Sequence, residues 1–199
     1  MADVIDYYVS PVSPWTYLGH EAFVALARTH RAPVALKPVD LGRVFPVSGG
    51  LPLAKRAPQR QAYRLVELRR WSAHRGIAMN AMPKHFPAPA DPAALLILAA
   101  AQEDEDAGLR LLGAIARAYW SEERNVGDAA TLHDIARAEG FDAARLAERA
   151  AAADTRMHYD TLTQEAIDRG VFGVPTYVLR GEMFWGQDRL DFLGRALAQ

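Results

Sequence analysis

The chain contains no cysteine among its 199 residues. This absence excludes structural disulfides, metal sites built on thiolates and redox chemistry that uses a protein dithiol. Any thiol that takes part in a reaction must therefore arrive with a ligand. The histidines show no metal-binding spacing such as His-Glu-x-x-His, so we expect no metal site.

An excess of either charge is also missing, since 23 basic residues stand against 24 acidic ones and no dense basic run occurs. Nucleic acid and a membrane surface are therefore not expected partners. The longest apolar stretch, PAALLILAAA, is too short to span a bilayer, and the opening MADVIDYY has no cationic leader. We expect a cytoplasmic protein whose partners are small molecules or a second copy of itself.

The apolar pattern at the two ends of the chain predicts a small sheet. DVIDYYV (3–9) and PVALKPVDL favour strands, and TYLGHEAFVALARTH between them favours a helix. Strand character returns in VPTYVLRGEMFWG (174–186), two short runs around a turn at Arg180-Gly181. DRLDFLGRALA then closes the chain as a helix.

Between these ends, from Gly42 to about Ala153, the pattern is almost entirely helical and rich in alanine. The order β-α-β, helices, then β-β-α predicts an α/β protein with a thioredoxin-like fold and a large all-helical insertion. We expect residues 1–41 and 154–199 to form the thioredoxin-like domain and residues 42–153 the helical insertion domain.

Two loops of the predicted domain face each other. The first, SPVSPWT, connects the end of a strand to the N-terminus of a helix, a position well suited to a reactive thiolate. The second, GVFGVPTY (170–177), places Val174-Pro175 directly before a strand. An ordinary trans proline fits there, but the facing loop favours a cis bond.

The motifs SPWTYLG, GVFGVPTY and FWGQDRL, taken in this order, resemble the 2-hydroxychromene-2-carboxylate isomerases and the similar kappa-class glutathione transferases. Both are branches of the DsbA-like thioredoxin superfamily, and the resemblance covers nearly the whole chain. It implies that a serine occupies the position of the reactive cysteine of the redox enzymes, and that glutathione, as cofactor, supplies the thiol.

Two serines are candidates for that position, Ser10 and Ser13. Counting back from Tyr17-Leu18-Gly19, which resembles the family's aromatic-Leu-Gly, favours Ser13. Ser13 is also a normal helix N-cap, and the two roles are compatible because the positive end of the helix favours a nearby thiolate. We expect its hydroxyl to donate to the glutathione sulfur and to lower the thiol pKa below the free value of about 8.5.

The resemblance also implies the other glutathione contacts. Val174, before Pro175, would pair its backbone with the cysteinyl backbone of glutathione. Gln187 and Asp188 match a polar-Asp pair, and Asp188 would hold the γ-glutamyl ammonium, unless it only caps or charges the N-terminus of the last helix. Arg60 matches a basic position for the glycyl carboxylate, although an arginine on such a charged helix is more often solvated.

For the acceptor substrate, the expected pocket residues are Trp15, Lys84, His85 and Trp120. Trp120 has an alternative role as a core residue of the helical domain, and the expectation for Lys84 and His85 comes from the resemblance alone. In two places the chain departs from the family, with Gly50 and Pro89 where asparagine is common.

The resemblance therefore implies a glutathione-dependent isomerase in aromatic hydrocarbon degradation, working as a homodimer. It would convert 2-hydroxychromene-2-carboxylate to trans-o-hydroxybenzylidenepyruvate. The alternatives are a kappa-like glutathione transferase, which consumes the thiol, and a non-catalytic DsbA-like binding protein. Thiol-disulfide exchange by the protein itself is excluded because the chain has no thiol.

Overall fold

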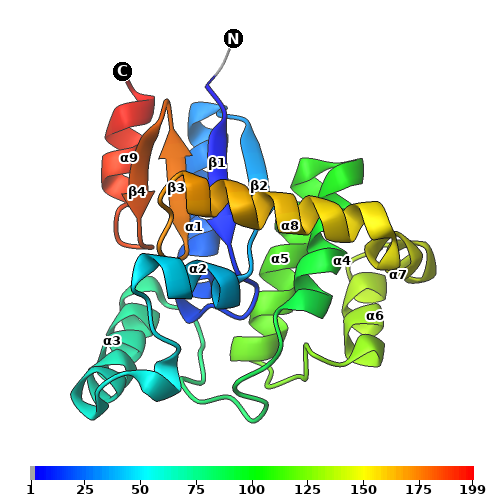
Figure 1. Ribbon diagram of the computed structural model, residues 1–199, viewed down its shortest axis with the longest axis horizontal. Coiled ribbons are helices and arrows are strands. Elements are labelled where there is room, and N and C mark those ends of the chain that lie inside the picture. Colours follow the sequence, from blue (N-terminus) through cyan, green and yellow to red (C-terminus); the bar gives the residue numbers. More distant parts are fainter. Residues whose placement is uncertain (1–2) are drawn as a thin grey trace.

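The sheet is assembled from the two ends of the chain. A computed structural model describes residues 3–199. Its four strands are β1 (Ile5–Val9), β2 (Val34–Pro38), β3 (Thr176–Leu179) and β4 (Glu182–Trp185), in the order β2-β1-β3-β4. β2 runs parallel to β1, whereas β3 and β4 are antiparallel to their neighbours. This is the thioredoxin-like sheet that the sequence predicts, and Figure 1 shows its strands side by side.

Helices cover both faces of the sheet because β1 alternates its apolar side chains. Ile5, Tyr7 and Val9 pack in the core cluster of α1 (Pro14–His30) and α9 (Leu190–Leu197). Tyr8 points the other way, into a separate cluster with Ala166 of α8 (Ala153–Asp168), which crosses the opposite face in Figure 1.

The hairpin between β3 and β4 forms where the sequence predicts it. Arg180 and Gly181 both have positive φ, 52° and 83°, which matches the two-residue turn whose twist suits a hairpin. The turn brings Trp185 and the segment after it back to the end of the sheet where β1 meets α1.

Every regular element between β2 and α8 is helical. These elements are α2 (Leu41–Ser48), the short 3₁₀ helix η1 (Leu53–Lys55), α3 (Pro58–Arg75), α4 (Asp91–Glu103), α5 (Glu105–Trp120), α6 (Ala129–Ala138) and α7 (Ala143–Ala151). The alanine-rich α4 and α5 pack closely and bury most of their residues. This pair forms the core of the helical part.

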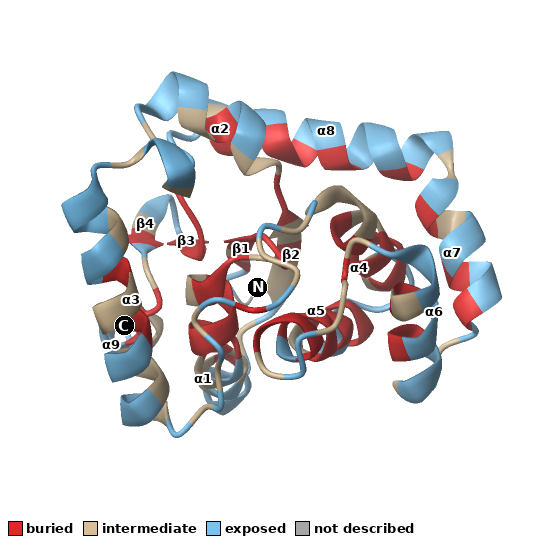
Figure 2. Cartoon of the chain, turned by 90° about the horizontal axis from the view of Figure 1, so that it is seen from below, coloured by how far each residue is buried: buried red, intermediate tan, exposed pale blue. Residues whose placement is uncertain are grey.

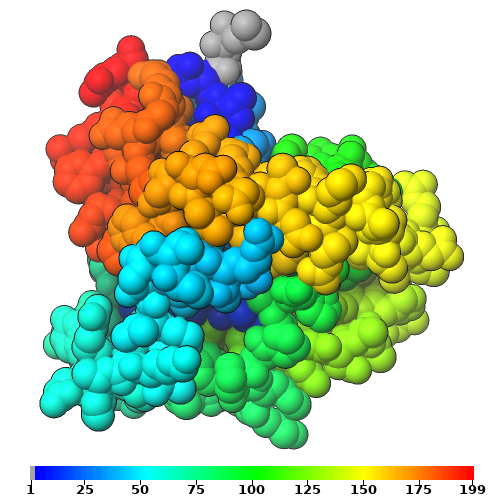
Figure 3. Space-filling model, viewed as in Figure 1, coloured from blue at the N-terminus to red at the C-terminus, as the bar shows by residue number. Residues whose placement is uncertain are grey.

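α3 differs from these helices because it is polar and buries only Arg64 and Leu68. Figure 2 shows it exposed over most of its length, at one side of the molecule. In the space-filling view, α2 and α3 form the lower left lobe (Figure 3). A helix with so little core to fill can carry side chains toward a ligand instead.

Within residues 3–199, no helix has both the length and the apolar character that crossing a bilayer requires.

Candidate functional site

Ser13 is the N-cap of α1. Its Oγ accepts a hydrogen bond from the Thr16 backbone N–H at 3.2 Å, and its side chain is buried. Within the described part of the chain, the Ser13 hydroxyl donates to no acceptor, so its hydrogen is available to a ligand. Ser10 lies just after the end of β1, where its carbonyl accepts from the Ser13 N–H at 3.0 Å. The structure thus places Ser13 at the helix start and Ser10 at the strand end, as predicted.

The second loop ends in a cis bond between Val174 and Pro175. Its shape is held by the Thr176 hydroxyl, which donates to the Gly173 carbonyl at 2.7 Å, and by the Pro175 carbonyl, which accepts from the Gly186 N–H at 2.9 Å. Among residues 3–199, neither the N–H nor the C=O of Val174 has a backbone hydrogen-bond partner. Val174 therefore offers one donor and one acceptor to a ligand strand.

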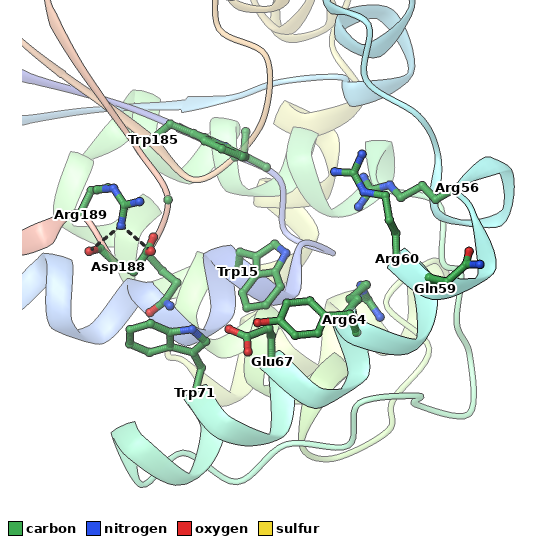
Figure 4. A pocket seen from close by; sticks show the side chains of 14 residues that line it. Trp15, Arg56, Gln59, Arg60, Arg64, Glu67, Trp71, Trp185, Asp188 and Arg189 are labelled. Carbon is green, nitrogen blue, oxygen red and sulfur yellow. Dashed lines mark hydrogen bonds and ion pairs between the residues drawn. The ribbon is translucent and has the colours of Figure 1, made fainter.

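A cleft of about 580 Å³ opens between these loops and α3 (Figure 4). One side comes from α1 and from the segments around β3 and β4; we call it the thioredoxin wall, and its residues are Trp15, Val174, Trp185, Gly186, Gln187, Asp188 and Arg189. The other side comes from α3 and the residues before it; this is the α3 wall, with Arg56, Gln59, Arg60, Tyr63, Arg64, Glu67 and Trp71.

The α3 wall arises from helical spacing. Arg60 and Arg64 are four residues apart on α3, as are Tyr63, Glu67 and Trp71 in succession, so each set lies along one face. Arg56 joins this wall from the segment between η1 and α3. Glu67 is paired with Arg70 at 2.7 Å. Arg64 is buried against aromatic rings, and this burial, with Arg56 nearby, lowers its pKa to about 10. It remains protonated at neutral pH, so the α3 wall is strongly cationic.

Gln187 of the thioredoxin wall is anchored by the protein itself. Arg75, at the end of α3, donates from Nε to the Gln187 Oε1 at 2.7 Å and from a terminal nitrogen to the Gln187 carbonyl at 2.6 Å. Gln187 is almost fully buried, and a Cβ at Gly19 of α1 would lie only 2.7 Å from its Cβ. Arg75 therefore ties the two walls together, and Gln187 has little freedom to move.

Asp188 lies beside Gln187 at the rim of the cleft. Its carboxylate is paired with Arg189, and no side chain caps the N-terminus of α9. The alternative role of Asp188 as a helix cap is therefore not seen. A carboxylate in this position, more than one-third exposed, remains accessible to a ligand ammonium.

Five of the predicted site residues share the cleft: Trp15, Arg60, Val174, Gln187 and Asp188. Ser13 and Pro175 do not line it, but each is within two positions of a residue that does. The structure thus brings together residues expected to contact glutathione, although these residues lie far apart in the sequence.

Three residues expected in the substrate pocket do not line this cleft. Lys84 is exposed, and its backbone N–H donates to Glu123 at 3.1 Å. His85 lies in the same loop, where its carbonyl accepts from the Tyr119 hydroxyl. Trp120 is fully buried beside Phe86 and Tyr119, because it lies on the apolar face of α5. Trp120 is a core residue, which corrects the expectation that it lines the pocket.

The departure at Gly50 has a steric explanation. A Cβ at Gly50 would lie too close to Cδ1 of Phe45, so asparagine does not fit there unless the ring moves.

Sequence reasoning also missed most of the α3 wall. The four-residue spacing of Arg56, Arg60 and Arg64 was the available signal, but a charged helix face is normally solvated. The position of α3 beside α1 depends on the tertiary fold.

Comparisons with known proteins agree with this architecture. Residues 4–198 match the family model described as the DSBA-like thioredoxin domain. The 2-hydroxychromene-2-carboxylate isomerase of Pseudomonas putida is 28% identical, over 98% of this chain and 95% of the relative. The protein of the same name from Sphingobium xenophagum is 27% identical, over 97% of both chains.

Solved structures show a similar fold. A structure of 2-hydroxychromene-2-carboxylate isomerase superposes with a TM-score of 0.84 at 25% identity, covering 98% of this chain and 94% of the other. The cytosolic disulfide reductase DsbM of Pseudomonas aeruginosa, determined with GSH, has a TM-score of 0.70 at 19% identity, over 98% of this chain and all of the other. The second likeness concerns the fold alone.

Proposed function

Since the chain belongs to the DSBA-like thioredoxin domain family, we propose that it is a glutathione-dependent isomerase acting on 2-hydroxychromene-2-carboxylate. The curated relatives that match nearly its full length carry that activity in their names. The chain has no cysteine of its own, so a thiol-dependent reaction on this fold requires an external thiol. The observation that carries the proposal is the unpaired backbone of Val174, which shares a cleft with Arg60 and Asp188.

Glutathione suits these three groups in both charge and shape. The N–H and C=O of Val174 pair with the cysteinyl residue, as in the addition of a strand to a sheet edge. Arg60 pairs with the glycyl carboxylate, and Asp188 pairs with the ammonium of the γ-glutamyl residue. These three groups would hold the tripeptide at the end of the sheet, near the N-terminus of α1.

Ser13 stabilises the thiolate in this arrangement. Its oxygen accepts the Thr16 N–H, which leaves its hydroxyl hydrogen to be donated to sulfur. The N-terminus of a 17-residue helix adds partial positive charge. Both effects favour the charged form of the thiol and lower its pKa. Ser13 acts by hydrogen bonding, and glutathione is the nucleophile.

The reaction conserves atoms and needs no oxidant. The ring of the substrate opens to the phenol and the conjugated 2-keto acid. When bound, glutathione would supply the nucleophile for reversible addition to the conjugated double bond, with the keto oxygen accepting the electron pair, so that the bond could rotate before loss of the thiol restores it in the trans geometry. Ser13 would donate a hydrogen bond to the thiol sulfur, and Arg60, Val174 and Asp188 would hold the tripeptide. Glutathione is released unchanged, so the protein contributes positioning and charge stabilisation.

A spectrophotometric assay with 2-hydroxychromene-2-carboxylate tests the proposal. We expect a rate of trans-o-hydroxybenzylidenepyruvate formation that depends on glutathione, with the total concentration of free thiol unchanged at the end. Absence of a glutathione-dependent rate would contradict this substrate assignment. Stoichiometric loss of thiol would indicate a kappa-like transferase, and absence of glutathione binding at millimolar concentration in calorimetry would indicate a non-catalytic binding protein.

A further inference from the structure

Arg64 is a buried cation without a partner. It is 9% exposed, it lines the cleft, and its terminal nitrogen Nη1 is buried with no hydrogen-bond acceptor among the described residues. Its guanidinium lies 5.4 Å from the centre of the Phe86 ring and 5.9 Å from that of Trp120. The rings provide a flat apolar support, but they do not satisfy the N–H groups.

The surroundings of Arg64 contain donors and no free carboxylate. Glu67, one turn along α3, is paired with Arg70, and Arg56 adds a further positive charge. Burying an unpaired charge is costly, and native proteins rarely leave buried donors unsatisfied. An anion bound in the cleft would relieve this cost.

From these observations, and resting on the proposed function, we propose that Arg64 binds the carboxylate of a planar aromatic acid, the acceptor substrate of the cleft. Arg60 and Arg64 then recognise different carboxylates. Arg60 is exposed and suits the solvated glycyl end of glutathione. Arg64 is buried between aromatic rings and suits a carboxylate attached to an aromatic framework.

The rest of the neighbourhood fits such a ligand. Trp15 and Tyr63 line the same cleft as Arg64, and Figure 4 shows Trp15 and Arg64 in one view of the site. Aromatic side chains of this kind stack on planar ligands. Two Arg N–H groups can donate hydrogen bonds to both carboxylate oxygens. This pairing fixes the orientation of the ligand and selects a negatively charged group. Arg64 is thus a specificity-determining residue for an acid over its neutral analogue.

Calorimetry with chromone-2-carboxylate and its neutral amide tests this role, with and without glutathione. We expect the wild-type protein to bind the acid at least about tenfold more tightly than the amide, the equivalent of about 1.4 kcal/mol. Arg64→Met should remove this preference, and Arg64→Lys should retain part of it. Arg69→Met is the matched control, because Arg69 is an exposed arginine on the same helix outside the cleft, and it should change nothing.

Each contrary outcome is distinct. Equal binding of acid and amide by the wild-type protein, or an unchanged preference in Arg64→Met, would overturn the assignment. If Arg64→Met keeps the preference for the acid but binds glutathione more weakly, Arg64 binds the glycyl carboxylate of glutathione. This result would also overturn the assignment. The preference for the acid over the amide is measured without glutathione, so this result stands even if the isomerase assay or glutathione binding fails.

Thermal melting separates binding from a purely structural role. Removal of an unpaired buried charge should leave the melting temperature of Arg64→Met equal to that of the wild type or higher. A marked fall in melting temperature, combined with an unchanged preference for the acid, would show that Arg64 serves only the fold and would contradict the proposal.

Discussion

The two walls of the cleft are built in different ways. The thioredoxin wall offers backbone groups and side chains that the protein itself holds, such as Val174 beside the Gly173–Thr176 bond and Gln187 beneath Arg75. The α3 wall offers long cationic side chains, and Nη1 of the most buried one, Arg64, has no hydrogen-bond partner among residues 3–199. The thioredoxin wall is held in place by hydrogen bonds within the protein and offers the backbone of Val174 to a ligand, whereas the α3 wall offers cationic side chains.

This difference separates two kinds of recognition. Backbone pairing at Val174 would recognise the extended shape of a peptide-like cofactor and would depend little on the side chain at position 174. The arginines of the α3 wall would recognise the positions of negative charges on a ligand. Substitutions behind the thioredoxin wall should therefore reduce stability, while substitutions on the α3 wall should change binding.

Arg75→Met should have the largest effect, since it cuts the connection between the walls. Two hydrogen bonds from a charged donor are lost and buried Gln187 acceptors are left unsatisfied, so we expect a loss of about 3 to 4 kcal/mol in the free energy of unfolding. Urea unfolding measures it. Arg70→Met is the control on the same helix, because Arg70 is exposed and only pairs with Glu67. Equal stability in the two variants would contradict a coupling through Gln187.

Acidification should weaken the helix that supports the thioredoxin wall. His20 of α1 is buried, its Nε2 donates to the Leu109 carbonyl at 3.0 Å and its Nδ1 accepts from the Tyr7 hydroxyl at 3.3 Å. Burial lowers its pKa from 6.5 to about 4. The unfolded chain therefore takes up a proton first, and the contribution of His20 is complete above about pH 6.5 and lost as the pH falls toward 4.

The corresponding loss is about 2 to 3 kcal/mol, which urea unfolding at a series of pH values would measure. His20→Gln should unfold with a shallower dependence on pH across this range. His133→Gln, at an exposed histidine, should keep the slope of the wild type. A slope that is the same in all three proteins would show that His20 titrates normally.

Gly19→Ala tests how tightly the thioredoxin wall is packed. The added methyl group would lie 2.7 Å from the Cβ of Gln187, and overpacking of this kind costs about 1 to 2 kcal/mol. Gly194→Ala in α9 is the matched control, because its methyl group meets only the flexible end of Leu26 at 3.2 Å, and alanine favours a helix. Greater destabilisation by Gly194→Ala would contradict the packing described for Gln187.

Arg60→Met tests the α3 wall and should have the smallest effect. Loss of one exposed charge-assisted contact should weaken glutathione binding about tenfold, or about 1.4 kcal/mol, with no change in unfolding. Calorimetry measures the affinity, and Arg69→Met again serves as control. Unaltered affinity would show that Arg60 belongs to the solvated face of α3, the alternative that the sequence left open.

The two loops beside the thioredoxin wall were predictable from local rules, whereas Gln187 and Asp188 of this wall were expected only from the family resemblance, and Trp185, Gly186 and Arg189 were not named. A serine before proline at a strand-to-helix junction predicts the N-cap at Ser13, and Val174-Pro175 before a strand predicts the loop that faces it. The α3 wall was only partly predictable, since Arg60 was named but Arg56 and Arg64 were not. Periodicity assigns residues to a helix face, but it does not say what that face meets. Trp120 was expected either in the pocket or in the core of the helical domain, and the structure places it in the core.

The pKa of the glutathione thiol in the complex tests the central claim most directly, through the ultraviolet absorbance of its thiolate against pH. Wild type should hold the pKa below the free value of about 8.5. Ser13→Ala should raise it by about one to two units, the equivalent of one hydrogen bond to a charged group, while Ser10→Ala leaves it unchanged. The same pKa in wild type and Ser13→Ala would reduce Ser13 to a helix cap and contradict the account.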